Sequence, residues 1–200
     1  MILLDPDLDP DVLPPSQVQA KSAPRTAPLL GPAAGDSGAA RSRRLPSPRT
    51  LARFLGQAQS HVRLPGRVSV LLTTDSALRR LNRRFRKIDQ PTDVLSFPAD
   101  AGFGRRQKIA GDLAISVPTA RRQAAQHGHP VSLEIKILIL HGLLHLAGYD
   151  HESDSGQMAR RERRLRALLG LPLGLIERVH SGAAAGPGRR PHSSSQGARS

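Results

Sequence analysis

The apolar residues between about positions 50 and 170 follow two periods, which predict a succession of helices and strands. Helical spacing runs through residues 50–61, where the apolar stripe is Leu51, Phe54, Leu55 and Ala58. Residues 67–73 instead alternate in a run rich in Val and Leu, which is typical of a strand. Helical spacing returns directly afterwards, where Thr74 or Asp75 can cap the next helix.

This second helix has two contrasting faces. Its apolar stripe consists of Leu78, Leu81 and Phe85, and its opposite face carries Arg79, Arg80, Arg83 and Arg84. For any one of these four arginines, a solvated helix face is the simplest interpretation.

The remaining pattern predicts two more strands and three more helices. The strands are expected at 93–97 and 112–117, and the glycines of 99–108 indicate a loop or hairpin between them. The helices are expected from Pro118 to Gly128, over 133–147 with Ser132 as N-cap, and over 157–169, where Gly170 and Pro172 stop it. Together the pattern predicts a single α+β domain in which a small mixed β-sheet packs with about five helices.

The chain ends differ from this central region. Residues 1–12 can supply a short edge strand from Met1–Asp5. Residues 13–48 are rich in Pro, Ala, Gly and Ser without an apolar period, so we expect a flexible insertion there. The folded domain is expected over 49–178, and 179–200 is expected to be a disordered basic tail.

The amino-acid composition limits which partners and which kinds of functional site the chain can have. The 200 residues include 30 basic and 16 acidic ones, a net charge of +14, which favours a polyanionic partner such as nucleic acid. With no cysteine, the chain has no disulfide framework, thiolate metal site or cysteine nucleophile. No apolar run is long enough to span a membrane, and the N-terminus lacks the features of a secretory signal. We therefore expect a cytoplasmic protein without a membrane partner, and no oligomeric state follows from the sequence.

The most informative segment is residues 141–151, which contains His141, His145 and His151. At about 3.6 residues per turn, the first two lie about 40° apart on one helix face. Gly148 can end that helix in a left-handed conformation, so that His151 returns as a third ligand. Chance produces only about 0.01 such triplets in a chain with this histidine content. Three neutral nitrogens with an open fourth position are the arrangement of a catalytic zinc site.

The same spacing also occurs in metzincin proteases, so a metallopeptidase is an alternative function. Those enzymes place a glutamate, their general base, directly after the first histidine. Here that position is Gly142, which cannot transfer a proton and is expected to open the helix face beside the metal. Asp150 or a substrate group is a conceivable base. A third possibility is a ribosome-assembly factor that contains a metal but is not catalytic.

Three segments in order resemble the YbeY family of bacterial endoribonucleases over about residues 45–170. The segments are Leu81–Pro98, Gly111–Ser116 and His141–His151, the last reading His-Gly-Leu-Leu-His-Leu-Ala-Gly-Tyr-Asp-His. The resemblance implies a single-domain zinc enzyme that acts on single-stranded RNA. It also implies a role in rRNA maturation, at the 3′ end of 16S rRNA, and in ribosome quality control, so that ribosomal RNA and the ribosome are the expected partners.

The resemblance also assigns residues. It makes His141, His145 and His151 the ligands of one Zn²⁺, and it makes Arg86 and His141 the catalytic residues. A guanidinium suits that role because it can hold two phosphate oxygens at once. The chain departs from the family in having Ile88 where many relatives have lysine. Because the chain has few aromatic residues on which bases could stack, we expect it to bind mainly the phosphate backbone of the RNA. Such binding is sensitive to salt.

Overall fold

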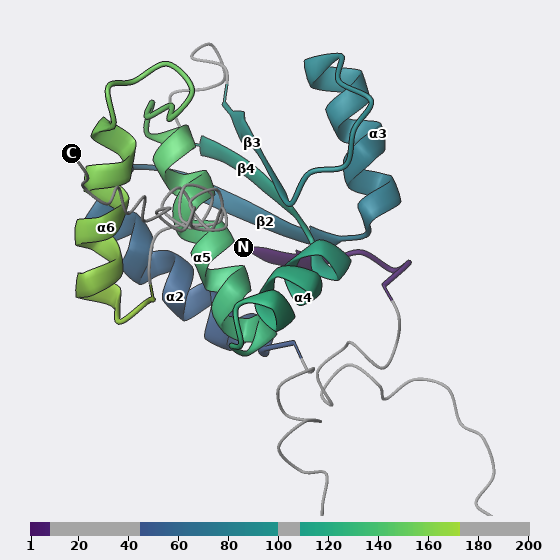
Figure 1. Ribbon diagram of the computed structural model, residues 1–200, viewed down its shortest axis with the longest axis horizontal. Coiled ribbons are helices and arrows are strands. Elements are labelled where there is room, and N and C mark those ends of the chain that lie inside the picture. The colour runs from purple at the N-terminus through teal and green to yellow at the C-terminus, as the bar shows by residue number, and fades with distance from the viewer. Residues whose placement is uncertain (9–44, 100–108, 173–200) are drawn as a thin grey trace, which may run out of the picture.

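The computed structural model describes residues 1–8, 45–99 and 109–172 (Figure 1). Within these residues the elements are β1 (Ile2–Leu4), α2 (Pro48–Val62), β2 (Arg67–Thr73), α3 (Asp75–Arg86), β3 (Val94–Pro98), β4 (Ile109–Ser116), α4 (Val117–Gln126), α5 (Val131–Leu146) and α6 (Gln157–Leu169). The predicted α+β class, with a small mixed sheet and five helices, is confirmed. Most of the expected insertion and all of the expected tail lie outside the described residues.

The four strands form one sheet in the order β1-β2-β4-β3. β1 and β2 are parallel, β2 and β4 are parallel, and β3 runs antiparallel to β4. β1, from the N-terminal segment where a short edge strand was expected, and β3 are the two edges. β4 begins earlier than expected, because Ile109 pairs with Arg67 and Gly111 with Pro98, and backbone pairing does not depend on an apolar pattern.

Three helices begin at hydroxyl caps. The side chains of Ser47, Thr74 and Ser116 accept hydrogen bonds from backbone N–H groups at the starts of α2, α3 and α4. The cap predicted for α5 was wrong. That helix begins at Val131 with Pro130 at the N-cap, and Ser132 lies inside its first turn. Proline suits this entry because its φ of −63° leads into the helix and its carbonyl accepts from Leu133 N at 2.9 Å.

The main core lies on one face of the sheet. Apolar side chains of β2 and β4, such as Val70 and Ile115, pack there with α2, α4, α5 and α6. α5 is the central helix, since twelve of its sixteen residues are buried, on all sides of its axis. Its apolar residues Ile135, Leu138, Leu140 and Leu144 are each fully buried. A helix held on all sides can carry functional side chains in fixed positions.

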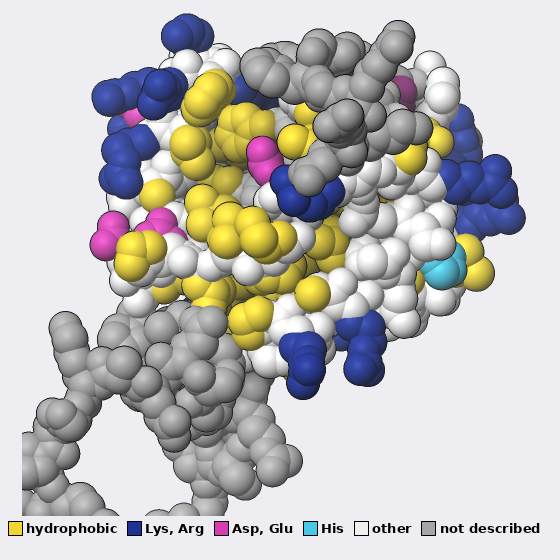
Figure 2. Space-filling model, turned by 180° about the vertical axis from the view of Figure 1, so that it is seen from behind, with side chains coloured by type: hydrophobic (Ala, Val, Ile, Leu, Met, Phe, Trp, Pro, Cys, Tyr) yellow, Lys and Arg dark blue, Asp and Glu magenta, His cyan; other side chains and the backbone are white. Residues whose placement is uncertain are grey.

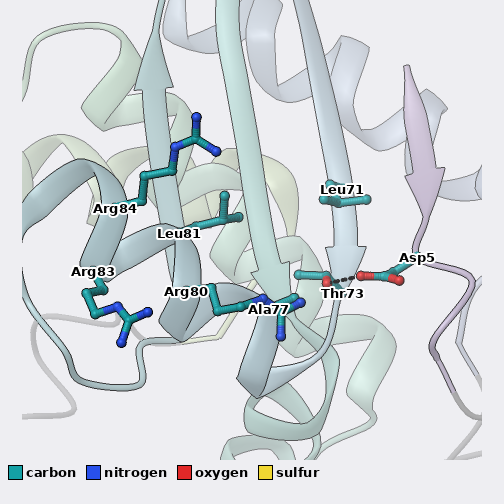
Figure 3. A pocket seen from close by; sticks show the side chains of 8 residues that line it. All are labelled: Asp5, Leu71, Thr73, Ala77, Arg80, Leu81, Arg83 and Arg84. Carbon is teal, nitrogen blue, oxygen red and sulfur yellow. Dashed lines mark hydrogen bonds between the residues drawn. The ribbon is translucent and has the colours of Figure 1, made fainter.

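The opposite face of the sheet is only partly covered, by α3. Leu78 of α3 packs with Leu95 and Ala114 in a second, small cluster. Figure 2 shows this side of the molecule, where apolar side chains gather beside a group of basic ones. A groove of about 560 Å³ runs between α3 and β2, and Arg80, Arg83 and Arg84 extend from its α3 side (Figure 3). At the other side of this groove, Thr73 donates a hydrogen bond to Asp5.

Candidate metal centre

The last turns of α5 bring two histidines together. His141 is 5% exposed and His145 is half-buried, and their Nε2 atoms lie 3.2 Å apart. This is the consequence of the four-residue spacing on one helix face. The apolar residues around α5 hold its backbone in place, so the two rings have few alternative positions.

The third histidine follows a turn. The backbone N–H of Gly148 bonds His145 O at 3.0 Å, and Gly148 has a φ of +88°, which favours glycine. The exposed His151 then lies with its ring centre 5.3 Å from those of both His141 and His145. One ring nitrogen from each histidine lies within 4.8 Å of the others. The structure thus brings the three predicted ligands together in a group that could hold a metal ion.

The donor set fits a metal ion such as zinc. Nitrogens at about 2.0–2.1 Å from a tetrahedral ion lie about 3.3 Å apart, close to the 3.2 Å between His141 and His145. Burial, followed by the neighbouring rings of His141 and His151, lowers the pKa of His145 to about 4. His145 is therefore neutral at pH 7, the state in which a histidine ring binds metals.

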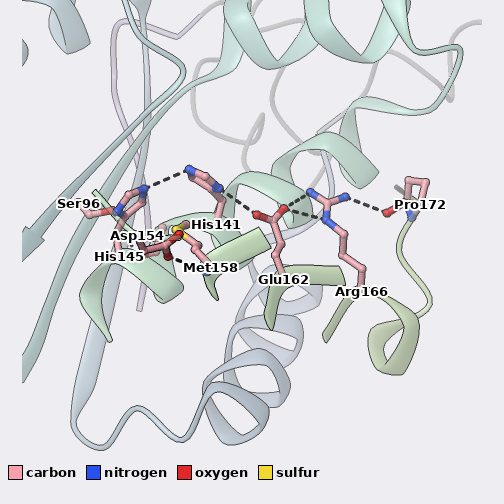
Figure 4. Close-up of polar contacts among 9 residues, drawn as sticks. Ser96, His141, His145, Asp154, Met158, Glu162, Arg166 and Pro172 are labelled. Carbon is pink, nitrogen blue, oxygen red and sulfur yellow. Dashed lines mark hydrogen bonds and ion pairs between the residues drawn. The ribbon is translucent and has the colours of Figure 1, made fainter. Parts of the chain in front are cut away.

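A buried ionic chain supports His141 from behind (Figure 4). Glu162 of α6 is 1% exposed and places Oε2 at 3.2 Å from His141 Nδ1. The other oxygen, Oε1, accepts from Arg166 Nε and Nη2 at 2.8 and 2.6 Å. Arg166 Nη1 also donates to Pro172 O at 2.9 Å. A carboxylate on the outer nitrogen of a metal-binding histidine fixes the ring orientation and the tautomer.

Glu162 and Arg166 were not among the residues expected at the site. Arg166 belongs to a run of five arginines that follows His151, yet it is 2% exposed and paired with Glu162. The sequence feature that could have indicated this ion pair is the four-residue spacing of Glu162 and Arg166, which places them on one face of α6. That this face turns inward follows from the packing of α6 onto α2 and α5.

The three histidines open onto a cavity of about 520 Å³. The cavity is also lined by Arg86, at the end of α3, by Thr92, just before β3, and by residues of β3 that include Ser96. Arg86 is exposed and is separated from His141 by 55 positions in the chain. The tertiary structure thus places the predicted arginine and the predicted ligands on one cavity.

Residues near the cavity mainly brace the backbone. Asp93 accepts from Val94 N at 2.8 Å and from Gln123 Nε2 at 2.9 Å. Ser96 Oγ donates to the carbonyl of Gly142 at 3.3 Å and so joins β3 to α5. Asp112 does not line the cavity, and its exposed side chain belongs to the opposite face of the sheet.

Asp150 is poorly suited to act as a base. Its carboxylate accepts from Ser153 Oγ at 2.8 Å and from Glu152 N at 3.1 Å. These two hydrogen bonds, the side-chain bond first, lower the pKa of Asp150. They also hold the turn that presents His151.

The expectation that Gly142 opens the helix face beside the metal was wrong. A Cβ atom at this position would meet Leu113 Cδ2 at 2.7 Å and Ser96 Oγ at 3.3 Å. Glycine is needed because α5 lies directly against β3 and β4 here. A glutamate at position 142 would collide with the sheet, which argues against the metzincin alternative more strongly than the missing carboxylate alone.

The other described histidines lie outside this group. His61 is exposed and its Nδ1 lies 2.9 Å from Gln57 O. His129 is partly buried, and its Nε2 lies 2.9 Å from the buried carboxylate of Glu134. His180 and His192 fall outside the described residues. Among the described residues, no helix is both long and apolar enough to cross a membrane.

Comparison with known proteins agrees with the motifs. Residues 48–170 match a family described as Endoribonuclease YbeY. A protein of that description from Solibacter usitatus is 55% identical over 129 residues, which are 64% of this chain and 84% of that protein. One from Koribacter versatilis is 49% identical over 133 residues, 66% of this chain and 84% of that protein. The solution structure of TM1509 from Thermotoga maritima has 25% identity and a TM-score of 0.43, over 72% of this chain and 95% of that one. On the family match and the two sequence relatives, the chain belongs to the YbeY family.

Proposed function

We propose that this protein is a metal-dependent endoribonuclease that cleaves single-stranded RNA. The observation that carries the proposal is one cavity lined both by the three histidines and by an exposed arginine, Arg86. The printed name of its relatives, Endoribonuclease YbeY, supports the substrate class. The net charge of +14 agrees with a polyanionic substrate.

Each residue has a role in this proposal. His141, His145 and His151 would hold one ion, with Zn²⁺ as the preferred identity. When bound, such an ion lowers the pKa of water and polarises phosphate oxygens. Arg86 would bind two oxygens of the scissile phosphate and stabilise the charge that develops there. Glu162 would keep His141 oriented toward the cavity, and the Arg166 guanidinium would hold Glu162 in place.

The cellular role follows from family membership. We propose that the substrate is ribosomal RNA, with the 3′ end of 16S rRNA as the processed site, and that the protein also takes part in ribosome quality control. The ribosome would then be its partner and the cytoplasm its location. These assignments come from the family resemblance, and the cavity itself contributes only the chemistry of phosphodiester cleavage.

Cleavage of single-stranded RNA tests the proposal. The purified protein would be assayed with and without chelator, beside His141→Ala, Arg86→Ala and the control Arg53→Ala. Arg53 is an exposed arginine on α2 that lines neither the cavity nor the groove. We expect chelator and His141→Ala to abolish cleavage, Arg86→Ala to slow it about 100- to 1,000-fold, and Arg53→Ala to leave it unchanged.

Three outcomes would contradict the proposal. Equal cleavage in every sample would indicate a contaminating nuclease. Chelator-sensitive cleavage of an unstructured peptide, without RNA cleavage, would favour a metallopeptidase. Normal ribosome binding and function with every hydrolytic activity lost would favour a non-catalytic assembly factor whose metal is structural.

A further inference from the structure

Phe85 departs from the core that its position in the sequence predicted. Of the apolar stripe of α3, Leu78 is fully buried and Leu81 is partly buried, whereas Phe85 is 58% exposed. Leaving this much of an aromatic ring in water forgoes the free energy of burying it. An exposed aromatic side chain in a well-ordered helix is therefore a candidate binding residue.

The Phe85 ring packs against another aromatic side chain. Phe85 meets Phe97 of β3 edge-to-face, with ring centres 5.2 Å apart and an interplanar angle of 71°. Phe97 is half-buried in the small cluster beneath α3. One side of the Phe85 ring thus rests on a fixed support, and a ligand that stacks on its exposed side would lose little entropy to ordering the ring.

Positive charge surrounds this ring. The guanidinium carbon of Arg84 lies 5.5 Å from the ring centre, and Arg86 lines the cavity with the three histidines. Arg83 extends from the same turn of α3 beside the groove (Figure 3). Within the described part of the chain, none of these three arginines forms an ion pair with a carboxylate.

An exposed aromatic ring among arginines is the combination by which proteins hold single-stranded nucleic acid. Bases stack on the ring, and the cations follow the phosphates. A purely apolar partner would use the ring but would leave the flanking charges without counterions. Phe85 and Arg86 are consecutive at the end of α3, so their Cα atoms lie about 3.8 Å apart, and both exposed side chains leave the helix in directions about 100° apart. A strand whose phosphate contacts Arg86 at the cavity can therefore place a neighbouring base at Phe85.

We propose that Phe85 is a stacking platform for one base of single-stranded RNA, next to the phosphate held by Arg86. The inference rests on the proposed function and adds a base-binding subsite to it. Because every base has a stacking face, the subsite would increase affinity with little preference among sequences. Phe85 would act on binding, and Arg86 would act on the reaction.

The chain contains no tryptophan, so Phe85→Trp introduces a single fluorescent reporter at the subsite. We expect its emission to be quenched when a short single-stranded RNA is mixed with the protein, before cleavage proceeds. A matched control is Phe54→Trp, since Phe54 is 6% exposed in the main core and its reporter should not respond. An RNA that lacks one base, moved along the strand, should lose the quenching at one position.

Phe85→Leu supplies the second measurement, because leucine keeps an apolar side chain but cannot stack. We expect KM for single-stranded RNA to rise about 5- to 150-fold with kcat nearly unchanged. The RNA without the stacked base should bind wild type and Phe85→Leu equally. Arg84→Ala should instead reduce the salt dependence of binding.

The outcomes separate this inference from the proposed function. If wild type cleaves RNA but Phe85→Leu has the same KM and Phe85→Trp is not quenched, the stacking platform is overturned. If wild type cleaves no RNA, the proposed function fails, and quenching of Phe85→Trp still decides whether the ring binds a base. If Phe85→Leu weakens binding equally for intact and base-lacking RNA, Phe85 serves the fold rather than stacking, which also overturns the inference.

Discussion

Helices α3 and α6 have similar sequences and different surroundings. Each carries five arginines, in α3 at 79, 80, 83, 84 and 86, and in α6 at 160, 161, 163, 164 and 166. In α6, Arg166 is buried against Glu162 and Arg161 donates to His61 O at 3.0 Å. In α3, all five guanidinium-bearing residues are exposed, and the described ion pair is Arg79 with Asp89.

The number of arginines in a helix therefore does not by itself identify a binding surface. α6 forms part of the buried side of the candidate metal centre, where the Arg166 guanidinium compensates the charge of Glu162. α3 forms the exposed side, where guanidinium groups meet solvent and are available to phosphates. Substitutions in α6 and in α3 test this comparison.

The largest effect is expected for Arg166→Ala. It leaves the Glu162 carboxylate buried without its main counter-charge, which should lower the free energy of unfolding by about 3–5 kcal/mol. Arg164→Ala, at an exposed position of the same helix, should change it by less than about 0.5 kcal/mol. Denaturant unfolding measures both. Equal losses of unfolding free energy in the two variants would contradict the prediction that the buried Arg166 stabilises the fold more than the exposed Arg164.

The second-largest effect is expected for Glu162→Gln, which keeps the shape of the side chain and removes its negative charge behind His141. Metal affinity should fall about 10- to 100-fold, because the ring loses its carboxylate partner. Competition with a chromophoric chelator measures it without reference to activity. The double variant Glu162→Leu with Arg166→Met should regain much of the stability lost in Arg166→Ala. It should not regain metal affinity, and if it did, Glu162 would have no orienting role.

A pH titration of the metal-stripped protein addresses His145. The unfolded chain binds a proton there near pH 6.5, whereas the folded protein binds it near pH 4. Between these values the unfolded state holds more protons, so the free energy of unfolding should fall as the pH is lowered from 6.5 to 4. His145→Gln should show a smaller fall over this window. An identical pH dependence in the two proteins would contradict the burial of this ring.

The smallest effect is expected on the exposed side, for Arg79→Ala. Its two bonds to Asp89, at 2.7 and 3.2 Å, join side chains that are 55% and 50% exposed. Water and salt screen such a pair, so the thermal unfolding midpoint should not change measurably. A clear decrease that disappears in high salt would show that the pair stabilises the turn before β3.

The local features could be predicted from the amino-acid sequence. Alternation placed β2, periodicity placed α6 at its observed bounds, and the spacing of His141 and His145 put both rings on one helix face. Gly148 ended that helix as predicted. These features depend on interactions between residues within one or two turns of each other, so a short stretch of sequence is enough to predict them.

The contacts between these short stretches depend on the tertiary structure. It brought Arg86 and the histidines to one cavity, buried Arg166 behind His141, left Phe85 exposed beside Phe97, and packed Gly142 against Leu113. None of these follows from periodicity, because each depends on how helices dock on the sheet between residues tens of positions apart. The sequence identified the three-histidine group that could hold a metal ion, and only the packing separated the arginine buried behind that group from the exposed arginines beside Phe85.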